Sequence, residues 1–294
     1  GQDAGAYNQN QDRLTVEFVR RWYDLWRERP GTGRRVNSGG AKIVFSDTQT
    51  YGRGAENYRR SGVVDPLRIP KDGFFAHKVM WDGWVDVENY HTHIIGHWNY
   101  TPDVRKPVYV VSSGDAVELF VNGKYKGTIE AISYDEQHKE LSRHSFQTVG
   151  EPERLKLTLM HGPQGVFADG ADIAMVQVEV VDDNGERCPL ANHKIKFDLQ
   201  GPAEWRGGIA QAADNYVLAK ELPVECGITR VMIRSTTQPG NVVLKVAAEG
   251  LASEEIAFST RPVEVKNGLS TFFPSVGLPS RFDRGETPSS PSYK

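Results

Sequence analysis

The sequence is poor in several features that would define its class at once. It has only two cysteines, Cys188 and Cys226, so a disulfide-rich framework is excluded, and whether these two pair is left open. No apolar run approaches the ~18 residues that predict a membrane-spanning helix. The charges are mixed along 294 residues with a net charge of −3, and no basic stripe indicates nucleic acid as a partner. A moderately polar chain remains, long enough for about two or three domains.

The first 84 residues have the pattern of mixed helix and strand. Apolar side chains spaced by three and four predict a helix over residues 11–29. A short strand is expected at 42–46, followed by a polar loop rich in glycine and arginine at 47–62. A second helix is expected over 71–80.

After Trp84 the pattern changes to short alternating runs about ten residues apart, which predict antiparallel β-domains. Asn122 and Gly123 predict a two-residue hairpin turn. A fresh series of strands begins after Gly150, so we expect two different β-domains, over residues 85–149 and 150–265. Residues 266–294 are rich in proline, serine and glycine and are predicted to be a linker or tail.

Several segments, in order, resemble one family. Residues 39–52, with 59–65 and 69–81, are similar to the eighth strand–helix unit of a TIM barrel in family-two glycoside hydrolases, particularly the β-galactosidase-like enzymes of polysaccharide-degrading bacteria. Residues 118–124 and 201–205 resemble the β-domains that follow that barrel. The resemblance implies a multidomain, mainly β chain: the end of a (β/α) TIM barrel at 1–84, then two immunoglobulin-like β-sandwich domains at 85–149 and 150–265.

The sequence departs from that family just after Lys124. Relatives continue through another strand and an aromatic-rich stretch, whereas here Tyr125 and Lys126 lead directly to Gly127. Something like two strands is absent. A sandwich without them would expose an edge and part of its core, so we hypothesise an omitted stretch after Lys126 in preference to a real deletion.

The resemblance implies a retaining glycoside hydrolase that cleaves terminal β-galactosides. Two carboxylates about 5 Å apart perform that reaction. In the family they follow barrel strands four and seven, and this chain matches neither motif, so no catalytic residue is assigned and the chain alone is expected to be inactive. The implied partners are a galactose-containing oligosaccharide or polysaccharide and the rest of the catalytic domain. The implied location is periplasmic or extracellular.

Polar side chains follow the last predicted barrel strand, where loops usually contact substrate. Carboxylate, amide and guanidinium groups bind sugar hydroxyls, and an aromatic ring can stack on a sugar. We therefore predict substrate contacts from Asp47, Gln49, Tyr51 and Arg53; the alternative is a solvated loop. The arginines at 53, 59 and 60 would also suit an anionic sugar.

Other clusters carry less weight. His91, His93 and His97 have no partner at a metal-binding spacing, so no metal and no cofactor are predicted. Trp81, Trp84 and Trp98 are expected to pack between domains more than to stack on sugar.

A second class of protein stays open: a non-catalytic carbohydrate-binding or adhesion-type immunoglobulin-like module. In that case residues 11–84 would form a self-contained helical unit. As the end of a barrel, they would form a helix, one strand and a helix with exposed apolar edges.

Overall fold

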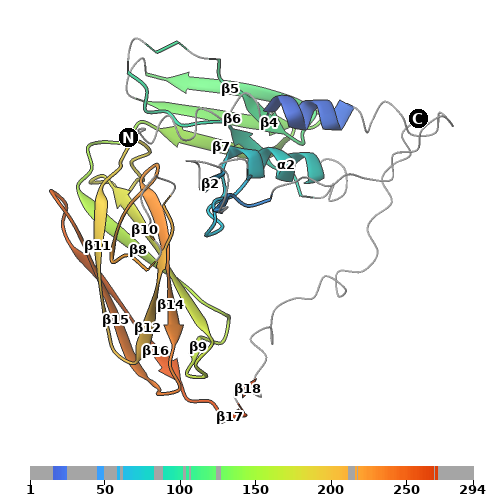
Figure 1. Cartoon of the computed structure of the whole chain (residues 1–294). Helices are drawn as coiled ribbons and strands as arrows, with labels where there is room; N and C mark the ends of the chain where they lie inside the picture. The colour runs from blue at the N-terminus through green and yellow to red at the C-terminus, as the bar shows by residue number, and fades with distance from the viewer. Residues whose placement is uncertain are drawn as a thin grey trace. The chain divides into compact units, whose positions relative to one another are not determined.

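A computed structural model of the chain describes residues 16–24, 45–49, 58–59, 62–82, 89–101, 104–105, 107–123, 127–210, 216, 218–267 and 269–270. The described part of the chain divides into two compact units (Figure 1). The division falls between Thr148 and Val149. The described residues before this point are called the N-terminal unit, and those after it the C-terminal unit. The domain bounds expected at residues 84 and 265 stay predictions. No helix among the described residues has the length and apolar character that crossing a membrane requires.

The C-terminal unit is a sandwich of two sheets (Figure 1). One sheet has the order β12-β14-β10-β8, with bounds Ala203–Gly208, Ile228–Ser235, Ile173–Val181 and Arg154–Met160. The other has the order β13-β11-β15-β16-β9, with bounds Glu221–Pro223, Lys194–Gln200, Gly240–Ala248, Glu254–Arg261 and Val166–Phe167. All neighbours run antiparallel except β9 and β16. A further small pair consists of β17 (Val265–Lys266) and β18 (Leu269–Ser270).

The core of this unit lies between the two sheets. Alternate residues of β10 are buried, because successive side chains of a strand point to opposite faces. Val176 and Val178 from β10 belong to the same buried cluster as Ile195 and Leu244 from the opposite sheet. Full burial of each such side chain stabilises the fold by roughly 1.5–3 kcal/mol. The period-two pattern of the sequence therefore corresponds to a two-sided β core.

The N-terminal unit begins with a helical segment and a short hairpin. Residues 16–24 are helical, and Trp22 contacts His77 edge-to-face with ring centroids 6.1 Å apart. The hairpin consists of β1 (Thr48–Gln49) and β2 (Tyr58–Arg59), which pair antiparallel. The helix α2 (Asp72–Asp82) carries His77 and buries Gly73, Ala76 and Val79, spaced three apart on one face.

In the described part of the N-terminal unit, five further strands form two sheets. One pairs β3 (Thr92–Ile94) with β4 (Val110–Ser112), and the other has the order β5-β6-β7, with bounds Ala116–Asn122, Thr128–Tyr134 and Glu140–Gln147. Ile94 of β3 is buried with Ile129 and Ala131 of β6, so the two sheets share a small core. Trp98 packs against this core, whereas Trp81 is 54% exposed; Trp84 lies outside the described residues.

The mainly β fold class is confirmed, and the end of a TIM barrel stays a proposal. The helix expected over 71–80 is present as α2. Within the region 47–62, which was expected to be a loop, the structure adds the β1–β2 pairing. The turn predicted at Asn122 and Gly123 is longer than two residues, since pairing of β5 with β6 ends at Asn122 and Thr128. Gly123 nevertheless has a positive φ of 90°, a conformation that glycine adopts readily in turns.

Candidate functional site

Asp47 lies directly before β1 and is buried. Its side chain has no exposed surface, and its Oδ2 atom lies 2.5 Å from Nζ of Lys71, whose side chain is 5% exposed. Its Oδ1 atom accepts a hydrogen bond of 2.8 Å from the backbone amide of Gly62. Asp47 therefore forms a buried ion pair within the N-terminal unit, and its predicted contact with sugar is untested.

Gln49, also predicted to contact substrate, lies on strand β1, which pairs with strand β2. Gln49 pairs with Tyr58, and Thr48 pairs with Arg59, so β1 and β2 bring residues 49 and 59 to one short hairpin. Tyr51 and Arg53 lie outside the described residues. Their contacts with substrate stay predictions, as does that of Gln49.

The turn after this hairpin is fixed by a second buried carboxylate. Asp65 Oδ1 accepts hydrogen bonds from the amides of Leu67 and Ile69, at 2.8 and 2.7 Å. Arg68, between them, has a φ of 67°, a left-handed conformation that few side chains adopt. The turn returns the chain to Lys71 and the start of α2. The sequence interpretation gave Lys71 no role in the site, and the only local signal was its position at the start of the helix predicted over 71–80.

A histidine pair lies where α2 contacts the β-strands of the same unit. The His93 ring stacks on Phe75 with centroids 4.1 Å apart and lies 4.5 Å from the His144 ring. His93 Nε2 lies 3.2 Å from Asp72 Oδ1. Burial lowers the pKa of His93 to about 4 in spite of this carboxylate. Burial, followed by the neighbouring His93, lowers the pKa of His144 to about 4 as well.

These histidines do not gather as metal ligands. Among the described residues, no group of three His, Cys, Asp or Glu side chains could hold a metal ion. His97 uses Nδ1 to accept a hydrogen bond of 3.0 Å from the amide of Asn99, and His91 Nδ1 lies 2.6 Å from Asp82 Oδ2. Each of the three histidines flagged in the sequence thus has a local partner.

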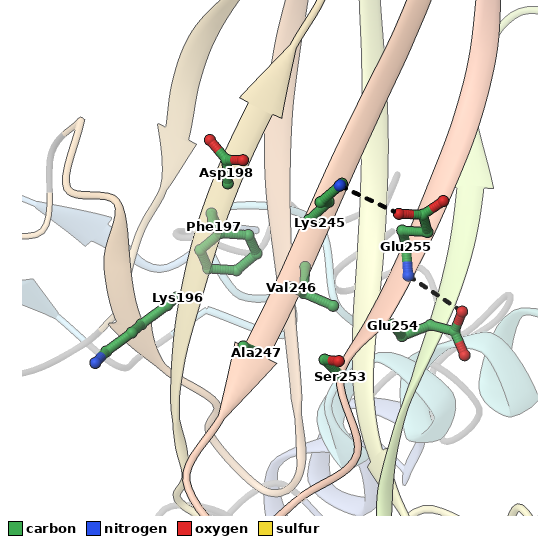
Figure 2. Close-up of a pocket in the computed structure, with 9 residues that line it drawn as sticks. All are labelled: Lys196, Phe197, Asp198, Lys245, Val246, Ala247, Ser253, Glu254 and Glu255. Atoms are coloured by element: carbon green, nitrogen blue, oxygen red, sulfur yellow. Dashed lines mark hydrogen bonds and ion pairs between the residues drawn. The ribbon is translucent and has the colours of Figure 1, made fainter.

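A shallow depression of about 520 Å³ lies on the C-terminal unit, over β11, β15 and the start of β16 (Figure 2). Charged side chains surround it, and Lys245 Nζ lies 3.8 Å from Glu255 Oε2 (Figure 2). The only aromatic residue in its lining is Phe197, which is buried. Sugar-binding surfaces commonly present an aromatic face, so this depression gives little support to a separate carbohydrate-binding module.

Comparison with known families identifies part of the C-terminal unit. Residues 157–257 match the family model described as glycoside hydrolase family 2 C-terminal domain 5. A β-glucuronidase of Formosa agariphila is 37% identical over 281 residues, which cover 88% of this chain and 28% of that protein. A β-galactosidase of Bacteroides ovatus is 28% identical over 225 residues, covering 67% of this chain and 25% of that protein. The chain thus spans between a quarter and a third of the length of these relatives.

Comparison with solved structures agrees with the sequence matches. A β-glucuronidase from glycoside hydrolase family 2 superposes with a TM-score of 0.76 at 35% identity, covering 88% of this chain and 29% of that one. A β-glycosidase from Bacteroides vulgatus shares the fold, with a TM-score of 0.63 at 20% identity over 73% of this chain and 30% of that one. The matched model places residues 157–257 among the C-terminal domains of family-2 glycoside hydrolases. The chain belongs to glycoside hydrolase family 2, and the resemblance seen in the sequence is confirmed.

The match to the Formosa agariphila protein also contains a length difference. It extends over 281 residues, yet 88% of 294 residues is only about 259. About 22 positions therefore have a residue in the relative alone. This difference is compatible with the strands hypothesised to be missing after Lys126.

Proposed function

We propose that the intact protein is a retaining glycoside hydrolase that removes a terminal β-linked sugar, and that residues 1–84 complete its TIM barrel. The observation that carries the proposal is the 37% identity to a family-2 β-glucuronidase over 88% of the chain. The packing of helical residues 16–24 on α2 through Trp22 and His77 supports it, because neighbouring helices form the outer ring of such a barrel.

Within this class, a β-glucuronide is the substrate that the observations favour. The relative named a β-glucuronidase is 37% identical, against 28% for the Bacteroides ovatus β-galactosidase. The β1–β2 hairpin carries Arg59, and a guanidinium can hold a carboxylate through two parallel hydrogen bonds. A terminal β-galactoside, as inferred from the sequence motifs, is the second candidate, supported by the relatives named as β-galactosidases.

The test compares two chromogenic substrates, 4-nitrophenyl β-D-glucuronide and 4-nitrophenyl β-D-galactoside, with the intact protein. We expect kcat/KM for the glucuronide to exceed that for the galactoside by roughly a hundredfold or more, since a site built for a charged group discriminates strongly. The reverse order would establish the galactoside. Cleavage of neither substrate, nor of other β-glycosides, would overturn the proposal.

The 294-residue chain provides the matched negative control. Retaining hydrolysis needs two carboxylates about 5 Å apart, and no residue of this chain is assigned to either role. We expect the pure chain to cleave neither substrate. We also propose a periplasmic or extracellular location for the intact protein, which cell fractionation with activity assays would test; activity confined to the cytoplasmic fraction would contradict it.

A further inference from the structure

A buried polar clamp joins three segments of the N-terminal unit. Lys71 Nζ and the amide of Gly62 both donate to the Asp47 carboxylate, at 2.5 and 2.8 Å. The backbone reinforces the junction: the amide of Asp47 donates to Val64 at 2.9 Å, and that of Lys71 to Val63 at 3.0 Å. Side-chain and backbone hydrogen bonds thus join Asp47, residues 62–64 and Lys71. This group of residues is called the clamp.

The clamp lies at the base of the β1–β2 hairpin. Asp47 immediately precedes β1, and Gly62 follows β2 after two further residues. Both ends of the hairpin are therefore fastened to the same carboxylate. A displacement of that carboxylate would move the backbone at Gln49 and Arg59, because these residues lie two and three positions from the fastened ends.

Gly62 shows how closely the segments approach. A Cβ atom at this position would lie 2.2 Å from the Asp47 nitrogen and 2.4 Å from the Ser46 carbonyl carbon. Both neighbours are backbone atoms, which cannot move aside as the end of a side chain can. Residue 62 must therefore be glycine for the carboxylate to reach the amide.

Stability alone does not explain a buried charge pair at this place. Removing two charges from water costs about as much as their attraction returns, so an apolar pair of similar volume is often equally stable. A charged pair does restrict geometry, since the Lys71 ammonium and the Gly62 amide both have to reach the Asp47 carboxylate. The choice of residues therefore indicates positioning.

We propose that Asp47 and Lys71 are positioning residues of the substrate site, and that their ion pair holds the β1–β2 hairpin, with Gln49 and Arg59, in the orientation that binds the terminal sugar. This inference rests on the proposed function as a glycoside hydrolase. It assigns Asp47 an indirect role through Gly62 and Lys71, in place of direct contact with the sugar.

The test uses the intact protein with the variants Lys71→Met, Asp47→Asn and the double variant Asp47→Asn/Lys71→Met. Each single change breaks the ion pair and leaves one of its two charges buried, whereas the double change removes both charges and keeps an acceptor for the Gly62 amide. We expect each single variant to raise KM roughly tenfold or more with kcat changed less than about threefold, because binding contacts are displaced while the reacting groups stay in place. The double variant should recover most of the lost affinity.

The matched control is Lys78→Met, which removes a lysine 3.2 Å from Asp82 on α2, in a pair where the lysine is 39% exposed. Its KM should equal that of the unchanged protein. If Asp47 contacts the sugar directly, the double variant will stay as impaired as Asp47→Asn, and the positioning role is overturned. An unchanged KM in a folded Lys71→Met protein also overturns it. Should that variant fail to fold, the double variant still distinguishes the two roles.

Hydrogen exchange separates failure of the clamp from failure of the proposed function. Lys71→Met should speed exchange at the amides of Asp47, Gly62 and Val63 by roughly tenfold or more in the intact protein, with unchanged exchange in β10. This readout needs no substrate. Faster exchange in a protein that cleaves no glycoside would support the clamp and reject the enzyme; unchanged exchange would reject the clamp.

Discussion

His144 accepts a hydrogen bond of 3.0 Å at Nδ1 from the backbone amide of Ile94. An imidazole that accepts at Nδ1 carries its single proton on Nε2 and is neutral. Protonation of Nδ1 would place its N–H opposite the Ile94 amide, which is also a donor, and would break this hydrogen bond between β7 and β3. The His93 ring is only 4.5 Å away, so a second positive charge there would add repulsion.

This arrangement predicts that the N-terminal unit loses stability in acid. Both histidines have a pKa of about 4 in the folded protein because of burial, compared with about 6.5 when unfolded. Between pH 6.5 and pH 4 the unfolded state binds more protons than the folded state. The free energy of unfolding is therefore highest above pH 6.5 and falls as the pH approaches 4. For His93 alone the loss is about 3 kcal/mol at pH 4; the half-buried His144 adds less.

The double variant His93→Gln/His144→Asn tests this prediction. Each replacement offers an uncharged group near the ring nitrogen that forms the hydrogen bond. Thermal unfolding between pH 4 and pH 7 should show a shallower pH dependence of Tm in the variant than in the unchanged chain. Parallel curves would show that carboxylates elsewhere, and not these histidines, cause the acid sensitivity.

Replacement of Asp182 is expected to be among the most destabilising single substitutions in the C-terminal unit. Its carboxylate accepts backbone hydrogen bonds from Gly150 at 2.8 Å, Glu186 at 2.9 Å and Asn184 at 3.0 Å. Burial alone would raise its pKa, but these three donors outweigh burial and lower it. Asp182→Ala leaves the three amides without this acceptor, so we expect about 3 kcal/mol less stability by denaturant unfolding.

Asp183→Ala is the matched control for that change. Asp183 is the next residue in the same turn, is exposed, and bonds only the Asn184 side chain among the described contacts. Its replacement should change the free energy of unfolding by less than about 0.5 kcal/mol. Equal losses from both variants would assign the effect to the turn as a whole and not to the Asp182 carboxylate.

The residues that sequence reasoning identified well are those whose signal is local. β10 is one of the alternating runs expected after residue 150, because the alternation of Val176, Val178 and Val180 is visible within one segment. The two-residue strand β9 was missed, because its support is the pairing of Val166 and Phe167 with β16, far along the chain. The clamp was missed for the same reason, since Lys71 lies 24 residues from Asp47 and nothing near either residue indicates the other.

The two cysteines are expected to be unreactive thiols in the folded chain. Cys188 and Cys226 form no disulfide and are both buried, and burial raises the pKa of Cys188 to about 11. The thiolate is the reactive form, so almost none is present at pH 8. Ellman's reagent should detect no rapidly reacting thiol in the native chain and two in denaturant without reductant. Detection of none in denaturant would show that the two form a disulfide.

Strand β5 predicts self-association of the 294-residue chain. Among the described strands it pairs only with β6, and all seven of its residues are exposed. Val117, Leu119 and Val121 point to one face and are 40%, 43% and 55% exposed. An apolar edge strand with free backbone groups pairs readily with another chain. Strands of the kind hypothesised to be missing after Lys126 would cover this edge.

A charge at the centre of β5 should oppose this association. We expect Leu119→Lys to keep the chain monomeric in sedimentation velocity at concentrations where the unchanged chain forms dimers or larger species, because charged side chains protect natural edge strands. Leu190→Lys is the matched control, since Leu190 is 47% exposed in a loop of the C-terminal unit. It should associate like the unchanged chain. If the unchanged chain is monomeric, the β5 edge is already covered. If both lysine variants reduce association equally, the added net charge explains the effect and the β5 edge does not.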